Sequence, residues 1–336
     1  MSDLGEFELI RLLTREIGAS DAGAHARPGI LVDVGDDAFV TVSADGATVW
    51  TTDTLVAGVH FLEDVTPWRN TGWKAIAVNV SDVAAMGAKP QNALVTLSLP
   101  PEQCVEDVVE LYRGMRQCSD AFGVTIGGGD IVRSPVFSVT VALSGSARLS
   151  PDGEPEVLRR GAACPGDAIA TTGTLGDAAA GLRLLQSGAS REDAANRPLI
   201  DAQERPQPRV AAGVAAVAAG ILCGIDISDG LVQDLGHICE MSGVTARVDI
   251  SRLPLSRELR TRFGKESVDL ALRGGEDYEL LLCGSRQALE AAGIDDLTVI
   301  GEIIGGPPAV RLVDGAGVEV HLESTGWDHL RGGPAS

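Results

Sequence analysis

The sequence predicts a mixed α/β (α+β) protein with two domains. Its 336 residues are enough for two domains of ordinary size, each with a core of its own. Patterns typical of helices and of strands occur in both halves of the chain. Proline, glycine and acidic residues gather at Ser150–Pro155, and the pattern restarts after them. We therefore expect one domain at 1–149 and a second at 150–336.

The first half mixes helical and strand patterns. Apolar residues recur at helical spacing in 6–17, 73–84 and 105–122. Gly87, with Pro90 just beyond it, predicts the end of the second of these helices. Apolar or alternating runs predict strands at 48–52, 92–99, 124–126 and 136–146. The strand at 124–126 is expected to end in the glycine run Gly127–Gly129.

The second half shows the same mixture. Strand patterns lie at 167–172, 245–250, 279–283, 298–303 and 310–313, and helical patterns at 176–186 and 231–241. The charge-free stretch 210–225 is slightly short for a membrane span, and we expect a packed helix that runs into a strand. The polar, proline-rich segment 187–208 is expected to be a loop with a short helical piece.

Composition excludes several classes of function. A formal net charge of -20 disfavours binding to nucleic acid or to an anionic membrane surface. The six cysteines form no C-x-x-C pair, so neither a zinc site nor a disulfide framework is indicated. The acidic N-terminus lacks the basic region of a signal peptide. We expect a cytoplasmic protein with inert thiols.

Aspartates at the ends of short apolar runs are the strongest chemical signal. They occur in Gly35-Asp36-Asp37, Thr51-Thr52-Asp53, Ser81-Asp82, Gly129-Asp130 and Asp226-Ile227-Ser228-Asp229. A single aspartate of this kind is usually a turn residue or a helix cap. Here each stands beside glycine, serine, threonine or a second aspartate, and the chain has only three lysines. Such a set of oxygens is suited to hard divalent cations, which can in turn hold phosphates.

Common nucleotide-binding motifs are missing. Gly264-Lys265 is followed by Glu266 and lacks the upstream glycine of a Walker A sequence. No kinase-type glycine-rich loop is found either. The run Gly127–Gly129 could cradle a phosphate through its backbone N–H groups, or it could form a tight turn. These residues alone leave both interpretations open.

Several longer motifs follow one another along the chain. They are Gly5-Glu6-Phe7, Gly35-Asp36-Asp37-Ala38, Thr51-Thr52-Asp53-Thr54-Leu55-Val56, His60-Phe61, Ala77-Val78-Asn79-Val80-Ser81-Asp82, Gly128-Gly129-Asp130, Asp226-Ile227-Ser228-Asp229-Gly230-Leu231 and Gly274-Gly275-Glu276-Asp277-Tyr278-Glu279-Leu280. In this order, from Glu6 to about Leu330, they closely resemble the thiamine-monophosphate kinase family. The wider superfamily includes aminoimidazole ribonucleotide synthetase, selenophosphate synthetase and a hydrogenase maturation factor. The resemblance implies a two-domain fold like that of aminoimidazole ribonucleotide synthetase. Its N-terminal domain would bind ATP and Mg²⁺ and dimerise through a barrel, and its C-terminal α/β domain would complete the active site.

The resemblance also implies roles for individual residues. The Mg²⁺ ligands would be Asp37, Thr51, Thr52, Asp53, Asp82, Asp130, Asp226 and Asp229. Among them, the catalytic residues would be Asp53, Asp82, Asp130 and Asp229. ATP would be bound by Tyr112, Gly129, Asp130, Arg160 and Ser228, and thiamine monophosphate by His60, Glu276 and Trp327. Taken singly, His60, Arg160, Glu276 and Trp327 have ordinary structural interpretations, so their roles depend on the resemblance. No role is carried over onto 187–207.

The implied reaction is ATP-dependent phosphorylation of thiamine monophosphate to thiamine diphosphate by a homodimer. The second pKa of the acceptor phosphate is about 6, so its oxygen is largely ionised at neutral pH and needs no general base. We therefore expect direct in-line transfer, assisted by several Mg²⁺ ions. The alternatives are another ATP-dependent enzyme of the superfamily and a non-catalytic protein that binds metal and nucleotide. Selenophosphate synthetase would have an early reactive cysteine and the hydrogenase maturation factor a C-terminal one, and this chain has neither.

Overall fold

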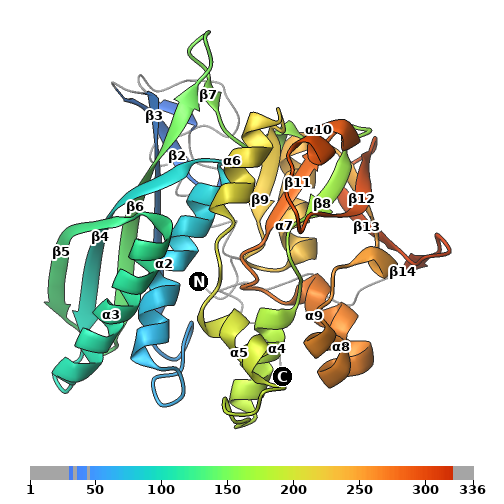
Figure 1. Ribbon diagram of the computed structural model, residues 1–336. Helices are drawn as coiled ribbons and strands as arrows, with labels where there is room; N and C mark the ends of the chain where they lie inside the picture. The colour runs from blue at the N-terminus through green and yellow to red at the C-terminus, as the bar shows by residue number, and fades with distance from the viewer. Residues whose placement is uncertain (1–29, 33–35, 44–45, 321–336) are drawn as a thin grey trace.

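The computed structural model describes residues 30–32, 36–43 and 46–320. They form two seven-stranded sheets with helices packed against them (Figure 1). The mixed α/β class is confirmed. The expected helix at 6–17 and the candidate residue Trp327 lie outside the described residues. Among the helices that the structure describes, none has the length and apolar character that crossing a lipid bilayer requires.

The first sheet is built from the N-terminal half of the chain. Its order is β1-β2-β3-β6-β4-β5, and β7 pairs with β6. These strands are β1 (Ile30–Val32), β2 (Phe39–Ser43), β3 (Gly46–Val56), β4 (Lys89–Leu99), β5 (Thr125–Arg133), β6 (Ser138–Leu149) and β7 (Pro155–Glu156). All neighbours are antiparallel except β4 and β5, and β5 forms one edge.

Helices α2 (Trp68–Ala85) and α3 (Val105–Phe122) belong to this half. Every residue of α2 from Thr71 to Ser81 is buried, because the helix contacts the first sheet, α3, and α5, α6 and β9 of the second half. A helix enclosed on all sides needs no polar face, and α2 is accordingly rich in alanine and valine. Helix α2 therefore lies between the two halves of the molecule and packs against both (Figure 1).

The second sheet has the order β14-β13-β10-β12-β8-β11-β9. Its strands are β8 (Ala168–Thr171), β9 (Cys223–Asp226), β10 (Thr245–Asp249), β11 (Leu280–Gly284), β12 (Thr298–Ile304), β13 (Ala309–Val313) and β14 (Glu319–Val320). The helices of this half are α4 (Asp177–Gln186), α5 (Arg197–Glu204), α6 (Val210–Ala218), α7 (Leu231–Ser242), α8 (Arg257–Phe263), α9 (Ser267–Arg273) and α10 (Arg286–Ala291). Strand β9 is one edge of the sheet and lies next to α2, so its carboxyl end reaches the boundary between the halves.

Most predicted elements are present, and one motif lies in a different setting from the one expected. The charge-free stretch forms α6 and runs into β9, as predicted, and the polar segment 187–208 contains the helix α5. The prediction that the strand at 124–126 ends in Gly127–Gly129 was wrong. Strand β5 continues to Arg133, because these glycines pair with β4, and Gly129 lies opposite Val95. The glycine run is thus an exposed strand at the edge of a sheet.

The crossing of α2 and α3 depends on two glycines. A Cβ on Gly72 would lie 1.9 Å from the Leu111 carbonyl oxygen, and one on Gly114 would lie 1.8 Å from the Arg69 carbonyl oxygen. Each helix therefore needs a glycine where the backbone of the other approaches. Because backbone atoms cannot turn aside as a side chain can, the helices would have to separate to admit a methyl group.

We predict that Gly114→Ala lowers the free energy of unfolding by about 1–3 kcal/mol, as overpacking a close contact does. Denaturant titration of the purified variant measures this. The matched control is Gly236→Ala in α7, where a Cβ would meet nothing within 4 Å. That variant should be neutral or more stable by up to about 1 kcal/mol, since alanine favours a helix over glycine. Equal losses in the two variants would contradict the close-contact explanation.

Candidate functional site

Three carboxylates from distant parts of the chain meet beside α2. One oxygen from each of Asp37, Asp82 and Asp226 lies within 4.8 Å of the other two. Asp37 precedes β2, Asp82 lies in the last turn of α2, and Asp226 is the last residue of β9. Both halves of the molecule thus contribute to one group, which we call the carboxylate cluster.

Hydroxyl groups and a fourth carboxylate surround this cluster. The Thr51 hydroxyl donates a hydrogen bond to Asp82 Oδ2, and the Ser81 hydroxyl donates one to Asp226 Oδ2 at 2.6 Å. Asp53 shares a hydrogen bond with Asp82. Because side chains alternate along a strand, Thr51 and Asp53 lie on the face of β3 that packs towards α2. Thr52 lies on the other face, where its hydroxyl donates to the Val141 carbonyl at 3.0 Å.

Burial makes these carboxyl groups harder to ionise. It raises the pKa of Asp82 well above its usual value, and the nearby Asp53 raises it further. Burial and then the charge of Asp37 raise the pKa of Asp226 to about 8. Burial raises the pKa of Asp53 in the same direction, against the effect of its hydrogen bond with Asp82. Four acidic groups held this closely favour a bound cation over four separate negative charges.

Arg160 supplies positive charge at one side of the cluster. Its guanidinium donates to Asp37 Oδ1 at 2.5 Å, and its backbone N–H donates to Asp36 Oδ1 at 2.8 Å. Burial raises the pKa of Asp36 to about 6 in spite of that hydrogen bond. The Arg160 side chain is only 21% exposed, and its Nε is buried without a hydrogen-bond partner among the described residues.

The donor set of the cluster fits a hard cation such as Mg²⁺. Asp37 Oδ2 is buried and accepts no hydrogen bond from any residue that the structure describes. An unsatisfied carboxylate oxygen facing two further carboxylates is a suitable position for a divalent ion. Asp37, Asp53, Asp82 and Asp226 could therefore act as ligands, with the Thr51 hydroxyl beside them.

The loop after β9 is shaped by Asp234, which sequence reasoning missed. Asp234 Oδ2 accepts hydrogen bonds from the backbone N–H groups of Ser228, Asp229 and Gly230, each at 3.1 Å. Gly230 has a φ of 119°, and a Cβ there would lie 2.9 Å from backbone atoms of Arg273. One oxygen of Asp229, one of Asp234 and a ring nitrogen of His237 also lie within 4.8 Å of one another. This loop fixes the positions of Ser228 and Asp229.

The Gly274–Leu280 motif runs alongside that loop. Glu276 N–H donates to the Ser228 carbonyl at 2.7 Å, and Tyr278 N–H donates to the Ile227 carbonyl at 2.9 Å. Glu276 and Tyr278 have positive φ values of 69° and 50°, a conformation that residues other than glycine seldom adopt. Such strain is retained where the surrounding structure enforces it, often at functional sites.

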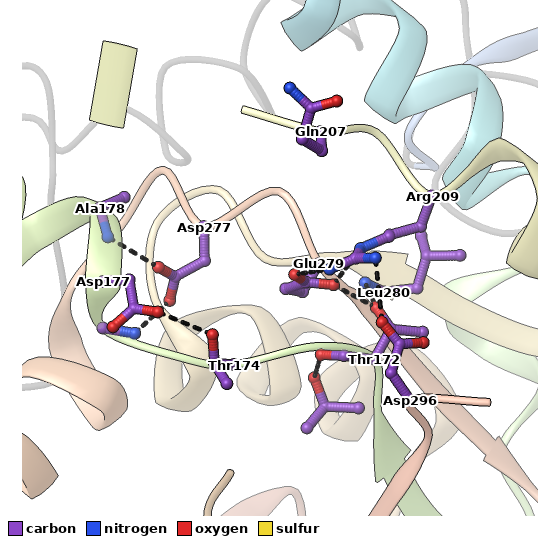
Figure 2. A network of polar contacts seen from close by, with 12 residues as sticks. Thr172, Thr174, Asp177, Ala178, Gln207, Arg209, Asp277, Glu279, Leu280 and Asp296 are labelled. Carbon is purple, nitrogen blue, oxygen red and sulfur yellow. Dashed lines mark hydrogen bonds and ion pairs between the residues drawn. The ribbon is translucent and has the colours of Figure 1, made fainter. Parts of the chain in front are cut away.

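Figure 2 shows the polar contacts of the neighbouring residues Asp277 and Glu279. Asp277 points towards the start of α4 and accepts from the N–H groups of Gly176 and Ala178, at 2.7 and 3.3 Å. Glu279 lies on the opposite side and is held by Arg209 at 2.6 Å and by the Thr172 hydroxyl at 2.5 Å. Asp277 and Glu279 are therefore anchors on either side of Tyr278, and Glu276 lies directly before the first of them.

Glu276 has partners that the sequence did not indicate. Its Oε1 lies 2.5 Å from the ammonium nitrogen of Lys74, and its Oε2 accepts from Gln203 Nε2 at 2.7 Å. His60, a further candidate for substrate binding, lies in the turn after β3. Its Nδ1 accepts from the Val56 N–H at 3.0 Å, which leaves Nε2 to carry the proton in the neutral ring.

Within one chain, three candidate residues lie apart from the carboxylate cluster. Gly129 and Asp130 lie on the edge strand β5, and strands β4 and β6 separate them from β3. Asp130 is in register with Thr54 across these strands, so three strand spacings, roughly 14 Å, separate the two. Asp130 is exposed and accepts from the Ile131 N–H, and Tyr112 is 37% exposed on α3.

Comparison with known proteins places this site in context. Models of the "AIR synthase related protein" N-terminal and C-terminal domains match residues 35–147 and 164–313. The thiamine-monophosphate kinase of Aquifex aeolicus (strain VF5) is 35% identical, over 98% of this chain and 99% of the relative. That of Escherichia coli (strain K12) is 36% identical, over 97% and 98%. Among solved structures, AaThiL complexed with AMPPCP and TMP matches with a TM-score of 0.86 and 33% identity, over 98% of both chains.

The raised pKa of Asp226 predicts how stability depends on pH when no metal is bound. A carboxyl with a pKa of about 8 in the folded state and 3.8 ordinarily binds its proton more tightly when folded. The stabilisation that this proton gives the folded state is therefore complete below about pH 4, and it is lost as pH rises towards 8. We predict that Asp226→Asn, in a chelator, unfolds a few degrees higher than the parent at pH 8, with a smaller difference at pH 5. Thermal unfolding across this range measures it.

The control for this experiment is Asp152→Asn, which removes an exposed carboxylate from the turn before β7. Its unfolding temperature should follow that of the parent at every pH. If Asp226→Asn behaved in the same way, Asp226 would not be the group whose protonation stabilises the metal-free protein.

Proposed function

Because the chain belongs to the thiamine-monophosphate kinase family, we propose that it transfers the γ-phosphoryl group of ATP directly to thiamine monophosphate, giving thiamine diphosphate. The observation that carries the proposal is the carboxylate cluster, which joins Asp37, Asp82 and Asp226 from both halves of the chain. The solved relative that holds AMPPCP, an ATP analogue, together with TMP supports the pairing of these two substrates.

The residues proposed as Mg²⁺ ligands are Asp37, Thr51, Thr52, Asp53, Asp82, Asp130, Asp226 and Asp229. When bound, the ions would neutralise phosphate oxygens and align donor and acceptor for in-line transfer. Thr52 would contribute through its backbone carbonyl or through a hydroxyl on the far face of β3. Ser81 orients Asp226 by a hydrogen bond, as outer-shell partners of metal ligands do, and the hydrogen bond from Thr51 to Asp82 keeps the Thr51 hydroxyl beside the cluster.

The nucleotide would be bound by Arg160, Ser228, Tyr112, Gly129 and Asp130. Arg160 would move its guanidinium from Asp37 to a phosphate oxygen, and its Nε–H has no partner among the described residues. Thiamine monophosphate would be bound by His60, Glu276 and Trp327. No residue is required to remove a proton, because the attacking phosphate oxygen is already ionised near neutral pH, with a pKa of about 6.

The direct test is incubation of the protein with ATP, Mg²⁺ and thiamine monophosphate, followed by chromatography of the products. Thiamine diphosphate and ADP should form in equal amounts. With a chiral γ-phosphate, the configuration should be inverted, as one in-line displacement requires. Retention would indicate a phosphoenzyme, and binding of both substrates without transfer would indicate a non-catalytic protein.

We further propose that the protein is a homodimer formed through the face of the first sheet that lies opposite α2. Strand register places Thr52, Ala142 and Leu94 in one row on that face. It exposes large apolar side chains, with Trp50 at 47%, Leu94 at 56% and Val132 at 44%. A solvated sheet face usually carries polar residues alone, so large apolar side chains exposed among the threonines and serines of this face support a second copy of the chain as its partner. The separation of Asp130 from Asp53 within one chain then suggests that Gly129, Asp130 and Tyr112 act in the partner's site.

We predict that Asp53→Ala lowers kcat on the order of a thousandfold, the effect of removing one well-placed electrostatic group from a phosphoryl-transfer site. Its unfolding temperature without metal should not fall, because a buried like charge is removed. Steady-state kinetics and thermal unfolding measure the two effects, with Asp152→Asn as the control that keeps full activity. Near-normal turnover of Asp53→Ala would refute its assignment as a ligand.

A mixed dimer tests the proposed sharing of sites. Asp53→Ala and Asp130→Ala chains carrying different affinity tags are co-expressed, and the heterodimer is purified through both tags. If each site takes Asp53 from one chain and Asp130 from the other, one of its two sites is intact and about half of the parent activity returns. If both residues act within one chain, every site lacks one of them and the heterodimer stays inactive.

A further inference from the structure

Lys74 is the one lysine of this chain that is deeply buried. The chain contains three lysines, and the side chain of Lys74 in α2 is only 3% exposed. A buried ammonium group is costly unless it is paired and hydrogen-bonded. Its nitrogen lies 2.5 Å from Glu276 Oε1 and 3.4 Å from Gln203 Oε1. Since lysine is scarce and usually exposed, this placement calls for a specific explanation.

Glu276 is held at both of its oxygens. Lys74 contacts Oε1, and Gln203 Nε2 donates to Oε2 at 2.7 Å. The backbone N–H of Glu276 also donates to the Ser228 carbonyl, which stands next to Asp229. The Glu276 side chain is nevertheless 25% exposed, so a ligand can still reach it. A group that is fixed on two sides and open on a third has the form of a preorganised binding residue.

Gln203 is itself fixed, because α5 is attached to α2. Asn70 Nδ2 donates to Glu204 Oε2 at 2.7 Å, and Arg191 forms an ion pair with the same carboxylate. One turn further along α2, Trp73 Nε1 donates to the Pro206 carbonyl at 2.8 Å. The Arg205 guanidinium lies 4.2 Å from the centre of the Trp73 ring. The segment 187–207 thus holds Gln203 against Glu276.

We propose that Lys74 and Gln203 are positioning residues for the acceptor, and that they hold the Glu276 carboxylate in the orientation in which it contacts the organic part of thiamine monophosphate. This inference rests on the proposed function. It assigns α5 and the segment around it to the acceptor site, and it leaves ATP binding to other residues.

The electrostatic reason for the arrangement lies in the nearby cluster. Glu276 is joined through Ser228 to the loop of Asp229, where negative charge is already concentrated. An unpaired carboxylate would add to that charge and repel the acceptor phosphate. Lys74 neutralises it, so that Glu276 can orient the acceptor by hydrogen bonding without raising the local negative charge.

The test compares Lys74→Met and Gln203→Leu with the parent. We expect each to raise KM for thiamine monophosphate, and its Kd by calorimetry, by about tenfold or more, the effect of losing a hydrogen bond to a charged group. KM for ATP should change by less than about twofold. Lys265→Met and Gln287→Leu, which change exposed residues outside the segment 187–207, are the matched controls and should leave both constants unaltered. Gln203→Leu keeps the ion pair between Lys74 and Glu276, so this variant alone tests the inference if Lys74→Met does not fold.

A double-mutant cycle separates positioning from a general loss of structure. In a Glu276→Gln background, Lys74→Met should raise KM for thiamine monophosphate far less than it does in the parent, because its effect passes through Glu276. Equal effects in both backgrounds, or equal rises in KM for both substrates, would overturn the inference. The activity of the parent protein distinguishes a failure of the proposed function from a failure of the inference about Lys74 and Gln203. A parent that forms no thiamine diphosphate refutes the proposed function, whereas an active parent with unchanged variants refutes this inference alone.

Discussion

The burial of several carboxylates at the end of α2 is the constraint on which the rest of the structure depends. At 4.8 Å, two ionised groups repel each other by about 3 kcal/mol at an effective dielectric constant of 20. The fold brings Asp37, Asp82 and Asp226 within this distance and also buries them, which raises the cost further. Such an arrangement persists without metal only if protons or Arg160 reduce the charge, and the raised pKa of Asp226, to about 8, shows the first of these effects.

The supporting structure keeps these groups together in spite of their repulsion. Helix α2 is enclosed on all sides, so the position of Asp82 is set by packing against both halves of the chain. Gly72 and Gly114 let α3 approach closely enough to hold α2 in place. Asp234 performs a similar task for the second loop, where one carboxylate oxygen gathers three backbone N–H groups. Both arrangements fix the positions of acidic side chains by hydrogen bonds and packing within the protein itself.

The sequence predicted the local part of this arrangement. Each of the aspartates Asp53, Asp82 and Asp226 lies where an apolar run predicted an element, and together with Asp37 they are brought together as the motif order implied. The sequence did not predict that Gly127–Asp130 would be an edge strand, because a glycine run has no apolar pattern and its pairing with β4 is a long-range property. Lys74, Gln203 and Asp234 were missed for a related reason. Each lies in a helix, where its position in the sequence pattern is that of an ordinary polar residue. Its partner is either a residue far away in the sequence or a backbone N–H group.

The contrast between the two ends of the site explains the distribution of positive charge. At the carboxylate cluster, Arg160 is the basic side chain that contacts an acidic group, and Asp37 Oδ2 has no partner among the described residues. At Glu276 the opposite holds, because Lys74 and Gln203 satisfy both oxygens. Under the proposed function, Asp37 Oδ2 would be open to a cation although Oδ1 is paired with Arg160, whereas both oxygens of Glu276 would be fixed for contact with the acceptor. The hydrogen bond from Glu276 N–H to the Ser228 carbonyl joins the segment of Glu276 to the loop that follows Asp226, so the backbone fixes the two regions relative to each other.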